Sequence, residues 1–281
     1  MSAVLALLAS LLWGTSDFLG GTASRRAPVP SVLGLAQLTA LVGLVPVAAL
    51  TGELDADRAY VLPGAVAGLV GVVALAAFYR ALATGTMGVV APVAALGVVV
   101  PVAVGLLQGE SPSVLQLLGI LVAGCGVVLA SGPELRGRAG AAPLLLALVA
   151  AFGFGAVLVL LAEGARASVV MTLLTMRLAA VLLLTGLLLA TARRRGVDLG
   201  VPRSALPVVA AVGAGDVLAN GAFAVASDMA GALVSVTAVL ASLYPVVTVL
   251  LARQVHGERL RPVQLTGVAG ALAGVGLLAV G

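Results

Sequence analysis

The sequence predicts an all-α membrane protein whose ten transmembrane helices form two inverted five-helix repeats. Hydrophobic residues make up 62% of the 281-residue chain and charged residues only 9%, whereas a soluble domain has about 25% charged residues. Ten apolar stretches each approach the roughly 20 residues that a spanning helix needs. A Gly-Glu…Gln…Gly pattern also occurs twice, and its members are shifted by 148 residues. A repeat of this length in one chain indicates two copies of one design.

The ten expected helices are separated by short linkers in which Gly, Pro and Arg are frequent. No linker is long enough to hold a soluble domain. The helices are expected at roughly 3–23, 30–51, 60–83, 86–107, 113–131, 143–162, 169–191, 204–226, 229–252 and 263–280.

The two repeats are expected to span 1–132 and 143–281. The Gly-Glu pair that contains Glu110 recurs around Glu258, and Gln and Gly follow both pairs at matching distances. Because each repeat has an odd number of helices, the second one enters the membrane upside down relative to the first. Inverted repeats of this kind place a binding site at their interface, near the bilayer midplane.

Three motifs give the chain a resemblance to a known family. They are Leu12-Trp13-Gly14, the stretch Ala241-Ser242-Leu243-Tyr244-Pro245-Val246-Val247-Thr248, and the two Gly-Glu…Gln…Gly segments. With them the chain resembles an EamA-like member of the drug/metabolite transporter superfamily over nearly its whole length. The resemblance implies ten helices in two inverted repeats and export or import of small metabolites. It implies that helices 1, 3, 4, 6, 8 and 9 line the cavity, which makes Trp13 a candidate substrate-binding residue.

The two halves differ where the family pattern is most specific. The first half has Ala91-Pro92 and Val100-Pro101 in place of the Ser-Leu-Tyr-Pro core. Gln37 stands opposite Arg177 when the halves are aligned. The two halves therefore need not contribute equally to function.

Two opposite charges are expected inside the bilayer, where charges are costly and usually face a cavity or a partner. At 1.5 Å per residue, Arg177 and Asp216 lie at roughly 12 and 15 Å from the same membrane face. An ion pair between them would either only join their helices or line the cavity with a substrate or proton role. Asn220, one turn after Asp216, would orient the carboxylate, contact substrate or bond another helix.

Asp17 follows Trp13 by one turn in the first expected helix. It is either a cation or proton site near one mouth of the cavity, or an interfacial acid that pairs with Arg25 or Arg26. The residue pattern leaves both interpretations open.

Prolines predict breaks in the fourth and ninth helices, because proline removes a backbone hydrogen bond and kinks a helix. Transporter sites are often built on such interrupted helices. The alternative is a kink needed only for packing. The candidate break residues are Pro92, Pro101 and Pro245, and the candidate substrate-binding residues beside the second break are Ser242, Tyr244 and Thr248.

The remaining polar and glycine motifs are interpreted structurally. Glu110 and Glu258 are expected to cap the N-terminus of the helix that follows each of them. His256, the one histidine, is expected to be a solvated loop residue. The Gly-xxx-Gly motifs at 64–68 and 270–274 predict close helix packing, within one bundle or between the protomers of a homodimer.

The arginines predict an orientation. Alternation of helices and loops puts twelve of the fifteen on one side of the membrane and two on the other. Lys and Arg favour the cytoplasmic side, so this distribution puts both termini outside the cytoplasm. The family resemblance implies the reverse.

Several function classes are excluded by the sequence. It has no Ser-His-Asp set, no cluster of Cys and His ligands and no P-loop, so we expect neither an enzyme nor a metal or other cofactor. The arginines form no stripe for nucleic acid. The leading hypothesis is a secondary transporter of small organic molecules in the cytoplasmic membrane, ion- or proton-coupled or facilitative. The alternatives are a lipid-handling, flippase-like subunit and a non-transporting membrane assembly subunit.

Overall fold

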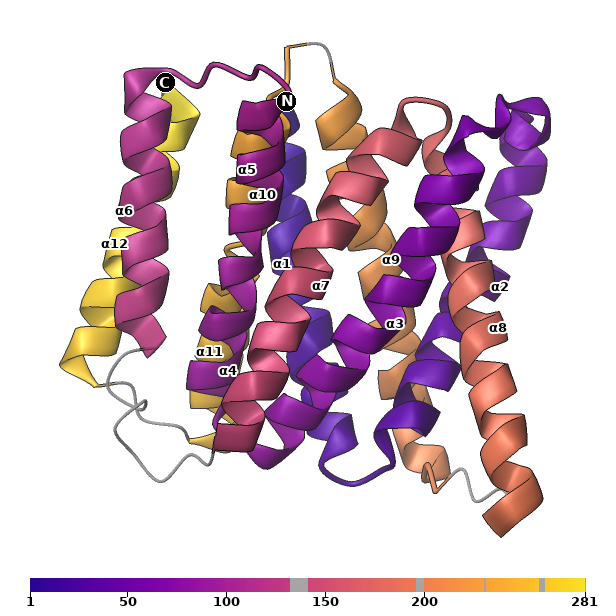
Figure 1. Ribbon diagram of the computed structural model, residues 1–281. Helices are drawn as coiled ribbons and strands as arrows, with labels where there is room; N and C mark the ends of the chain where they lie inside the picture. The colour runs from indigo at the N-terminus through magenta and orange to yellow at the C-terminus, as the bar shows by residue number, and fades with distance from the viewer. Residues whose placement is uncertain (132–140, 196–199, 230, 258–260, 281) are drawn as a thin grey trace.

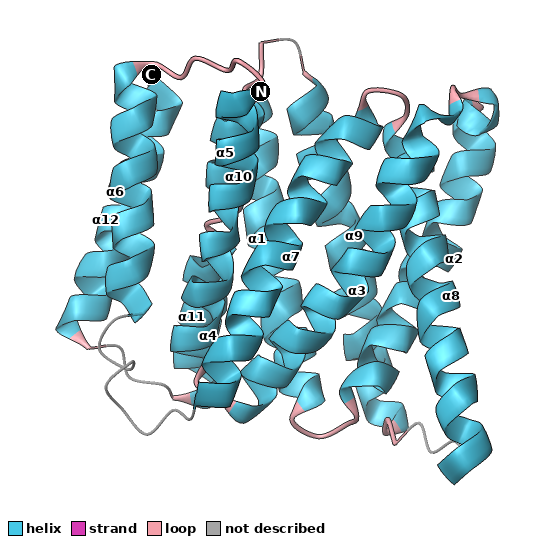
Figure 2. Ribbon diagram, in the orientation of Figure 1, coloured by secondary structure: helices cyan, strands magenta, loops and turns pink. Residues whose placement is uncertain are grey.

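The structure is a computed structural model that describes residues 1–131, 141–195, 200–229, 231–257 and 261–280, and all regular structure in this part of the chain is helical (Figures 1 and 2). Short 3-10 turns are η1 (Glu53–Asp55), η2 (Arg58–Tyr60), η3 (Leu96–Val98) and η5 (Arg203–Ala205). The α-helices are α1 (Ser2–Ser24), α2 (Val29–Thr51), α3 (Val61–Thr84), α4 (Met87–Ala95), α5 (Val99–Leu107), α6 (Val114–Ser131), α7 (Ala141–Ala165), α8 (Val169–Arg195), α9 (Leu206–Asp228), α10 (Val234–Ala241), α11 (Tyr244–His256) and α12 (Pro262–Val280).

Seven segments of the described chain are long and apolar enough to cross a membrane, so the protein is a multi-pass membrane protein. Of the other expected spans, the fourth and fifth contain shorter apolar helices at Val93–Leu107 and Val114–Gly126. The tenth corresponds to α12. The seven segments are Ser2–Ser24, Val29–Thr51, Arg58–Thr84, Ala142–Ala165, Val169–Ala190, Arg203–Asp228 and Val234–His256.

The expected ninth helix is broken just before the Tyr244-Pro245 step, as the proline predicted. Helix α10 ends at Ala241 and α11 begins at Tyr244. Proline has no amide to donate to the carbonyl four residues earlier, which here belongs to Ala241. The outer limits of this helix were predicted wrongly, because it runs from Val234 to His256 rather than over 229–252.

The break in the fourth expected helix lies between its two prolines rather than at either of them. Helix α4 ends at Ala95, η3 follows, and α5 begins at Val99. Pro101 cannot donate to the carbonyl of Gly97, which lies within η3. Pro101 is therefore the counterpart of Pro245, whereas Pro92 lies within α4 and was wrongly identified as a break residue.

The two halves of the chain run in opposite directions and pack into each other. In Figure 1, α1 descends from the face that holds both termini, whereas α7 ascends towards it. Helix α6 packs on α12, α2 on α8, α3 on α7 and α1 on α9, so the main partners come from the other half. The pair α6–α12 lies at one end of the bundle and the pair α2–α8 at the other (Figure 1).

Glycines allow the closest approaches between the halves, and they occur in matching pairs. A Cβ at Gly68 of α3 would clash with the carbonyl oxygen of Met176 in α8. A Cβ at Gly213 of α9 would clash with the carbonyl oxygen of Ala36 in α2. The third helix of each half thus lies directly on the second helix of the other. The Gly-xxx-Gly motif at 64–68 accordingly packs within one bundle.

Candidate functional site

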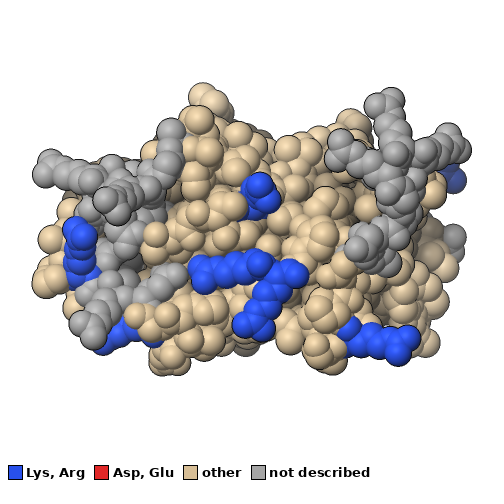
Figure 3. Space-filling model, turned by 90° about the horizontal axis from the view of Figure 1, so that it is seen from below, with Lys and Arg blue, Asp and Glu red and all other residues tan. Residues whose placement is uncertain are grey.

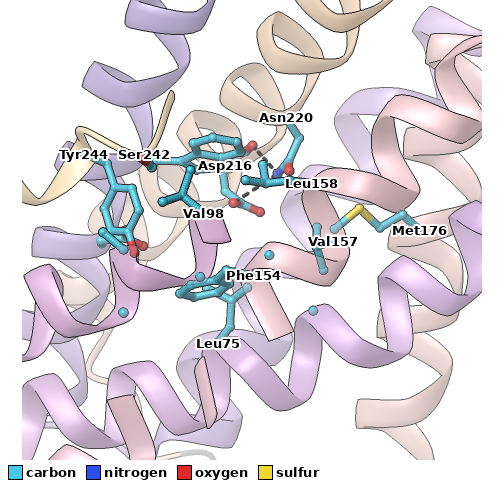
Figure 4. Close-up of a pocket in the computed structure, with 17 residues that line it drawn as sticks. Leu75, Val98, Phe154, Val157, Leu158, Met176, Asp216, Asn220, Ser242 and Tyr244 are labelled. Atoms are coloured by element: carbon cyan, nitrogen blue, oxygen red, sulfur yellow. Dashed lines mark hydrogen bonds between the residues drawn. The ribbon is translucent and has the colours of Figure 1, made fainter. Parts of the chain in front are cut away.

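A cavity lies between the two broken helices. It is bounded by α1, α3, α4 with η3, α7, α9 and the α10–α11 break, together with one side chain of α8. The family resemblance implies that expected helices 1, 3, 4, 6, 8 and 9 line the cavity, and these correspond to α1, α3, α4–α5, α7, α9 and α10–α11. The side chain from α8 is an addition. The apolar and aromatic residues of the wall include Leu75, Val98, Phe154, Val157, Leu158 and Met176 (Figure 4).

Most of the expected substrate-binding residues meet at this cavity. Two do not line it, because Arg177 and Thr248 have no exposed surface and lie behind the wall. Those that line it are Trp13, Asp17, Asp216, Asn220, Ser242 and Tyr244.

Arg177 and Asp216 form the ion pair that their depths predicted. One terminal nitrogen of Arg177, Nη1, lies 2.7 Å from Oδ2 of Asp216. The arginine side chain is completely buried, whereas that of Asp216 is 13% exposed and lines the cavity. The guanidinium therefore neutralises the carboxylate from behind and presents no charge to the cavity.

Arg177 also contacts its own counterpart in the other half. The same Nη1 donates a hydrogen bond of 2.7 Å to Oε1 of Gln37. Equivalent residues of two repeats can touch only where the axis that relates the repeats passes between them. The Gln37–Arg177 contact therefore lies on that axis. The guanidinium's other nitrogens, Nε and Nη2, have no hydrogen-bond partner within the described residues.

Asn220 fixes the position of the Asp216 carboxylate. Its Nδ2 donates to Oδ1 of Asp216 at 3.1 Å and to the backbone carbonyl of Asp216 at 2.7 Å (Figure 4). The carboxylate thus has one oxygen on the arginine and the other on the amide. Of the alternatives for Asn220, the geometry favours orientation of the carboxylate.

Asp17 lies inside the bundle and lines the cavity with only 6% of its surface exposed. It does not pair with Arg25 or Arg26, which are exposed at the end of α1, so the interfacial alternative is wrong. Within the described residues, no hydrogen bond or ion pair reaches its carboxylate. The like charge of Asp216 acts on it.

The α10–α11 break is held against α1. A Cβ at Gly14 would lie 2.5 Å from the carbonyl oxygen of Tyr244, so only glycine fits this contact. The hydroxyl of Thr248 lies 3.1 Å from the carbonyl oxygen of Gly14 and 3.2 Å from that of Tyr244, so it can donate to either. Thr248 therefore fastens the break to α1 rather than facing the cavity.

The break between α4 and α5 makes the same kind of contact between a glycine and a backbone carbonyl. A Cβ at Gly155 of α7 would clash with the carbonyl oxygen of Gly97 in η3. Each broken helix is thus seated on the first helix of the opposite half. Ser242, beside the second break, lines the cavity but donates its hydroxyl to the Val239 carbonyl at 2.8 Å.

Aromatic rings lie in and behind the wall of the cavity, and only Trp13 and Tyr244 were predicted as site residues. The ring of Phe78 lies edge-on to Phe154 at 5.3 Å and to Tyr244 at 6.3 Å between centroids. Trp13 contacts Phe223 at 5.9 Å. Phe154 was missed, although its place opposite Trp13 in the repeat alignment was a usable signal.

Glu110 caps a helix of the other half, not the helix that follows it. Its two carboxylate oxygens accept hydrogen bonds from the backbone amides of Val234 at 2.7 Å and Ser235 at 3.1 Å, at the start of α10. Ser113 and Gln116 cap α6 instead, each side chain accepting from the other's backbone amide at 2.8 and 3.1 Å. The expectation for Glu110 was therefore wrong.

The other two structural expectations differ in their outcome. His256 is not a solvated loop residue, because it ends α11, is half-buried and has Nε2 3.0 Å from the Thr22 hydroxyl. Its ring also lies 5.2 Å from that of Phe18. The prediction for Glu258 lies outside the described residues.

Comparison with known proteins shows the family. A sequence model of the EamA-like transporter family matches residues 1–132 and again 141–280. The chain belongs to the EamA-like transporter family. This EamA-like protein thus carries two family repeats, consistent with the drug/metabolite transporter superfamily, and such transporters are in general not enzymes.

Solved structures support the fold of the EamA-like chain. One crystal structure, titled only as that of a protein, matches with a TM-score of 0.75 at 20% sequence identity. The match covers 99% of this chain and 96% of that one. No curated protein matches the sequence.

Proposed function

We propose that this EamA-like protein is a secondary transporter that moves small organic metabolites or drugs across the cytoplasmic membrane by alternating access. In this proposal α4–α5, α6 and α12 also cross the bilayer, which gives ten spans. Transport is facilitative or coupled to an ion or proton gradient. Family membership and the arrangement of the cavity support the proposal.

The observation that carries the proposal is a cavity bounded by two broken helices, with a few polar residues in a mainly apolar wall. Asp216 is the eleventh of the 23 residues of α9. At 1.5 Å per residue, this position lies near the middle of a hydrocarbon core about 30 Å thick. Buried charge at this depth usually marks a substrate or ion pathway. Each break rests on the opposite half, so a shift of one half against the other would move both breaks together.

The cavity also separates the proposal from its alternatives. An assembly subunit needs polar residues only at helix ends, whereas Asp17, Asp216 and Asn220 converge inside the bundle. A lipid-handling protein needs a cationic groove for the headgroup. Among the described residues, Arg177 is the one buried arginine within a spanning segment, and it does not face the cavity.

The test is solute flux in reconstituted vesicles, measured over a metabolite panel for the unchanged protein and for Pro245→Ala. Alanine at position 245 would supply an N–H that can donate to the carbonyl of Ala241, and this would favour one continuous helix from α10 to α11. We expect flux of at least one solute by the unchanged protein and loss of that flux in the variant. Pro46→Ala is the matched control, because Pro46 lies within α2, exposed and away from the cavity. Full flux in Pro245→Ala would remove the break from the mechanism, and no flux of any solute would oppose transport itself.

A further inference from the structure

The charges around the cavity do not balance. Two carboxylates line it, those of Asp17 and Asp216. One guanidinium, that of Arg177, neutralises Asp216 at 2.7 Å. Asp17 receives neither an ion pair nor a hydrogen bond within the described residues and is 6% exposed. An unpaired buried charge costs several kcal/mol, so a carboxylate at this position favours the binding of a proton or of a cationic group.

The surroundings of Asp17 indicate which cation fits. Trp13 precedes Asp17 by four residues in α1, so both side chains lie on the same face of the helix, and both line the cavity. Phe154 and Tyr244 line it as well. Aromatic faces attract organic cations, whereas a hard metal ion takes a shell of six or more oxygen ligands. The wall is mainly apolar and supplies no such shell.

A polar group of Tyr244 is also without a partner. Its hydroxyl is buried and has no hydrogen-bond partner within the described residues. The side chain lines the same cavity as Asp17. Tyr244 therefore has an unused hydrogen-bonding group beside this cavity in addition to its aromatic ring.

We propose that the cavity binds an amphipathic organic cation, an amine or quaternary ammonium compound, with Asp17 as its counter-ion and Trp13, Phe154 and Tyr244 around its apolar part. The proposal rests on the proposed transport function, and it names the class of substrate for that site. Asp216 takes no part in charge recognition, because Arg177 and Asn220 already satisfy its carboxylate.

Trp13 provides a direct measurement, because it is the single tryptophan of the chain and lines the cavity. The probe is benzyltrimethylammonium, and the matched probe is benzyldimethylamine N-oxide, which has the same shape but no net charge. We expect the cation to quench Trp13 fluorescence with an affinity about tenfold or more above that of the N-oxide. Equal affinity for the two probes would overturn the proposal.

Variants assign the charge to Asp17. We expect Asp17→Asn to lose the preference for the cation and Asp17→Glu to keep it. Asp228→Asn is the control, because Asp228 is exposed at the end of α9 and outside the cavity. A cation preference that persists in Asp17→Asn would overturn the proposal. If that variant does not fold, the two probes on the unchanged protein decide alone.

Vesicle flux separates this proposal from the function on which it rests. Flux of a neutral or anionic solute without binding of benzyltrimethylammonium would leave transport standing and overturn the cation site. Binding of benzyltrimethylammonium without flux of any solute would support the site and count against transport.

Discussion

Arg177 is the side chain that most depends on its neighbours. It has no exposed surface, and its described partners are Asp216 and Gln37. The pair with Asp216 could be predicted, because sequential antiparallel helices start and end at the same membrane face and residue counting gives the depth. The contact with Gln37 could not, because it depends on where the axis between the repeats passes through the packed bundle.

Removal of one member of this pair should be worse than removal of both. Asp216→Asn leaves the guanidinium buried without its counter-ion, which costs about 3–5 kcal/mol in comparable pairs. The double variant Arg177→Gln with Asp216→Asn should recover most of the lost thermal stability of the purified protein. Arg166→Gln is the control, because its ion pair with Glu163 is exposed and contributes little. A double variant no more stable than Asp216→Asn alone would contradict the expected energetics.

At the scale of elements, the positions of most helices follow from apolar length, and the breaks follow from proline. The location of a break within its helix is less direct. A proline removes the bond to the residue four positions earlier, so the break lies upstream of Pro101. Pro92 carries the same chemistry but lies inside α4. The close contact between Gly155 and the Gly97 carbonyl determines which proline lies beside the break. This is a tertiary contact that the local sequence does not contain.

Helix capping also depends on tertiary contacts that the local sequence does not contain. Glu110 precedes α6 in the sequence, yet its carboxylate holds the start of α10. A carboxylate can cap any helix whose N-terminus lies nearby. Here the helix that begins beside the Glu110 carboxylate, α10, belongs to the other half.

Glu110→Gln should therefore weaken the contact between the halves at α10. A lost N-terminal cap costs about 0.5–2 kcal/mol, and glutamine keeps only part of the interaction. We expect a lower thermal unfolding temperature of the purified protein. Hydrogen exchange should also be faster at the amides of Val234 and Ser235. Glu163→Gln, at an exposed glutamate, should change neither. Unchanged exchange at α10 in Glu110→Gln would mean that the cap does not hold this helix end.

At the scale of the whole molecule, the two membrane faces differ in charge. The face opposite the termini displays exposed arginines, and no acidic residue is visible among its described residues (Figure 3). The face that holds the termini carries Arg58 and Arg166 together with Glu53, Glu110 and Asp228. The described, exposed arginines of the opposite face are Arg25, Arg26, Arg80, Arg203, Arg253 and Arg261.

This asymmetry predicts the orientation of the protein in the membrane. Because Lys and Arg favour the cytoplasmic side, the arginine face should lie in the cytoplasm and both termini outside it. An alkaline phosphatase fused after Gly281 should then be active. As a second measurement, Asp57→Cys should react with a membrane-impermeant maleimide in intact cells, and Arg26→Cys only after permeabilisation. The native Cys125 is exposed and is replaced by alanine in both variants. An inactive fusion together with the reverse labelling would place both termini in the cytoplasm, as the family resemblance implied, and would show that helix insertion overrides the arginine distribution in this chain.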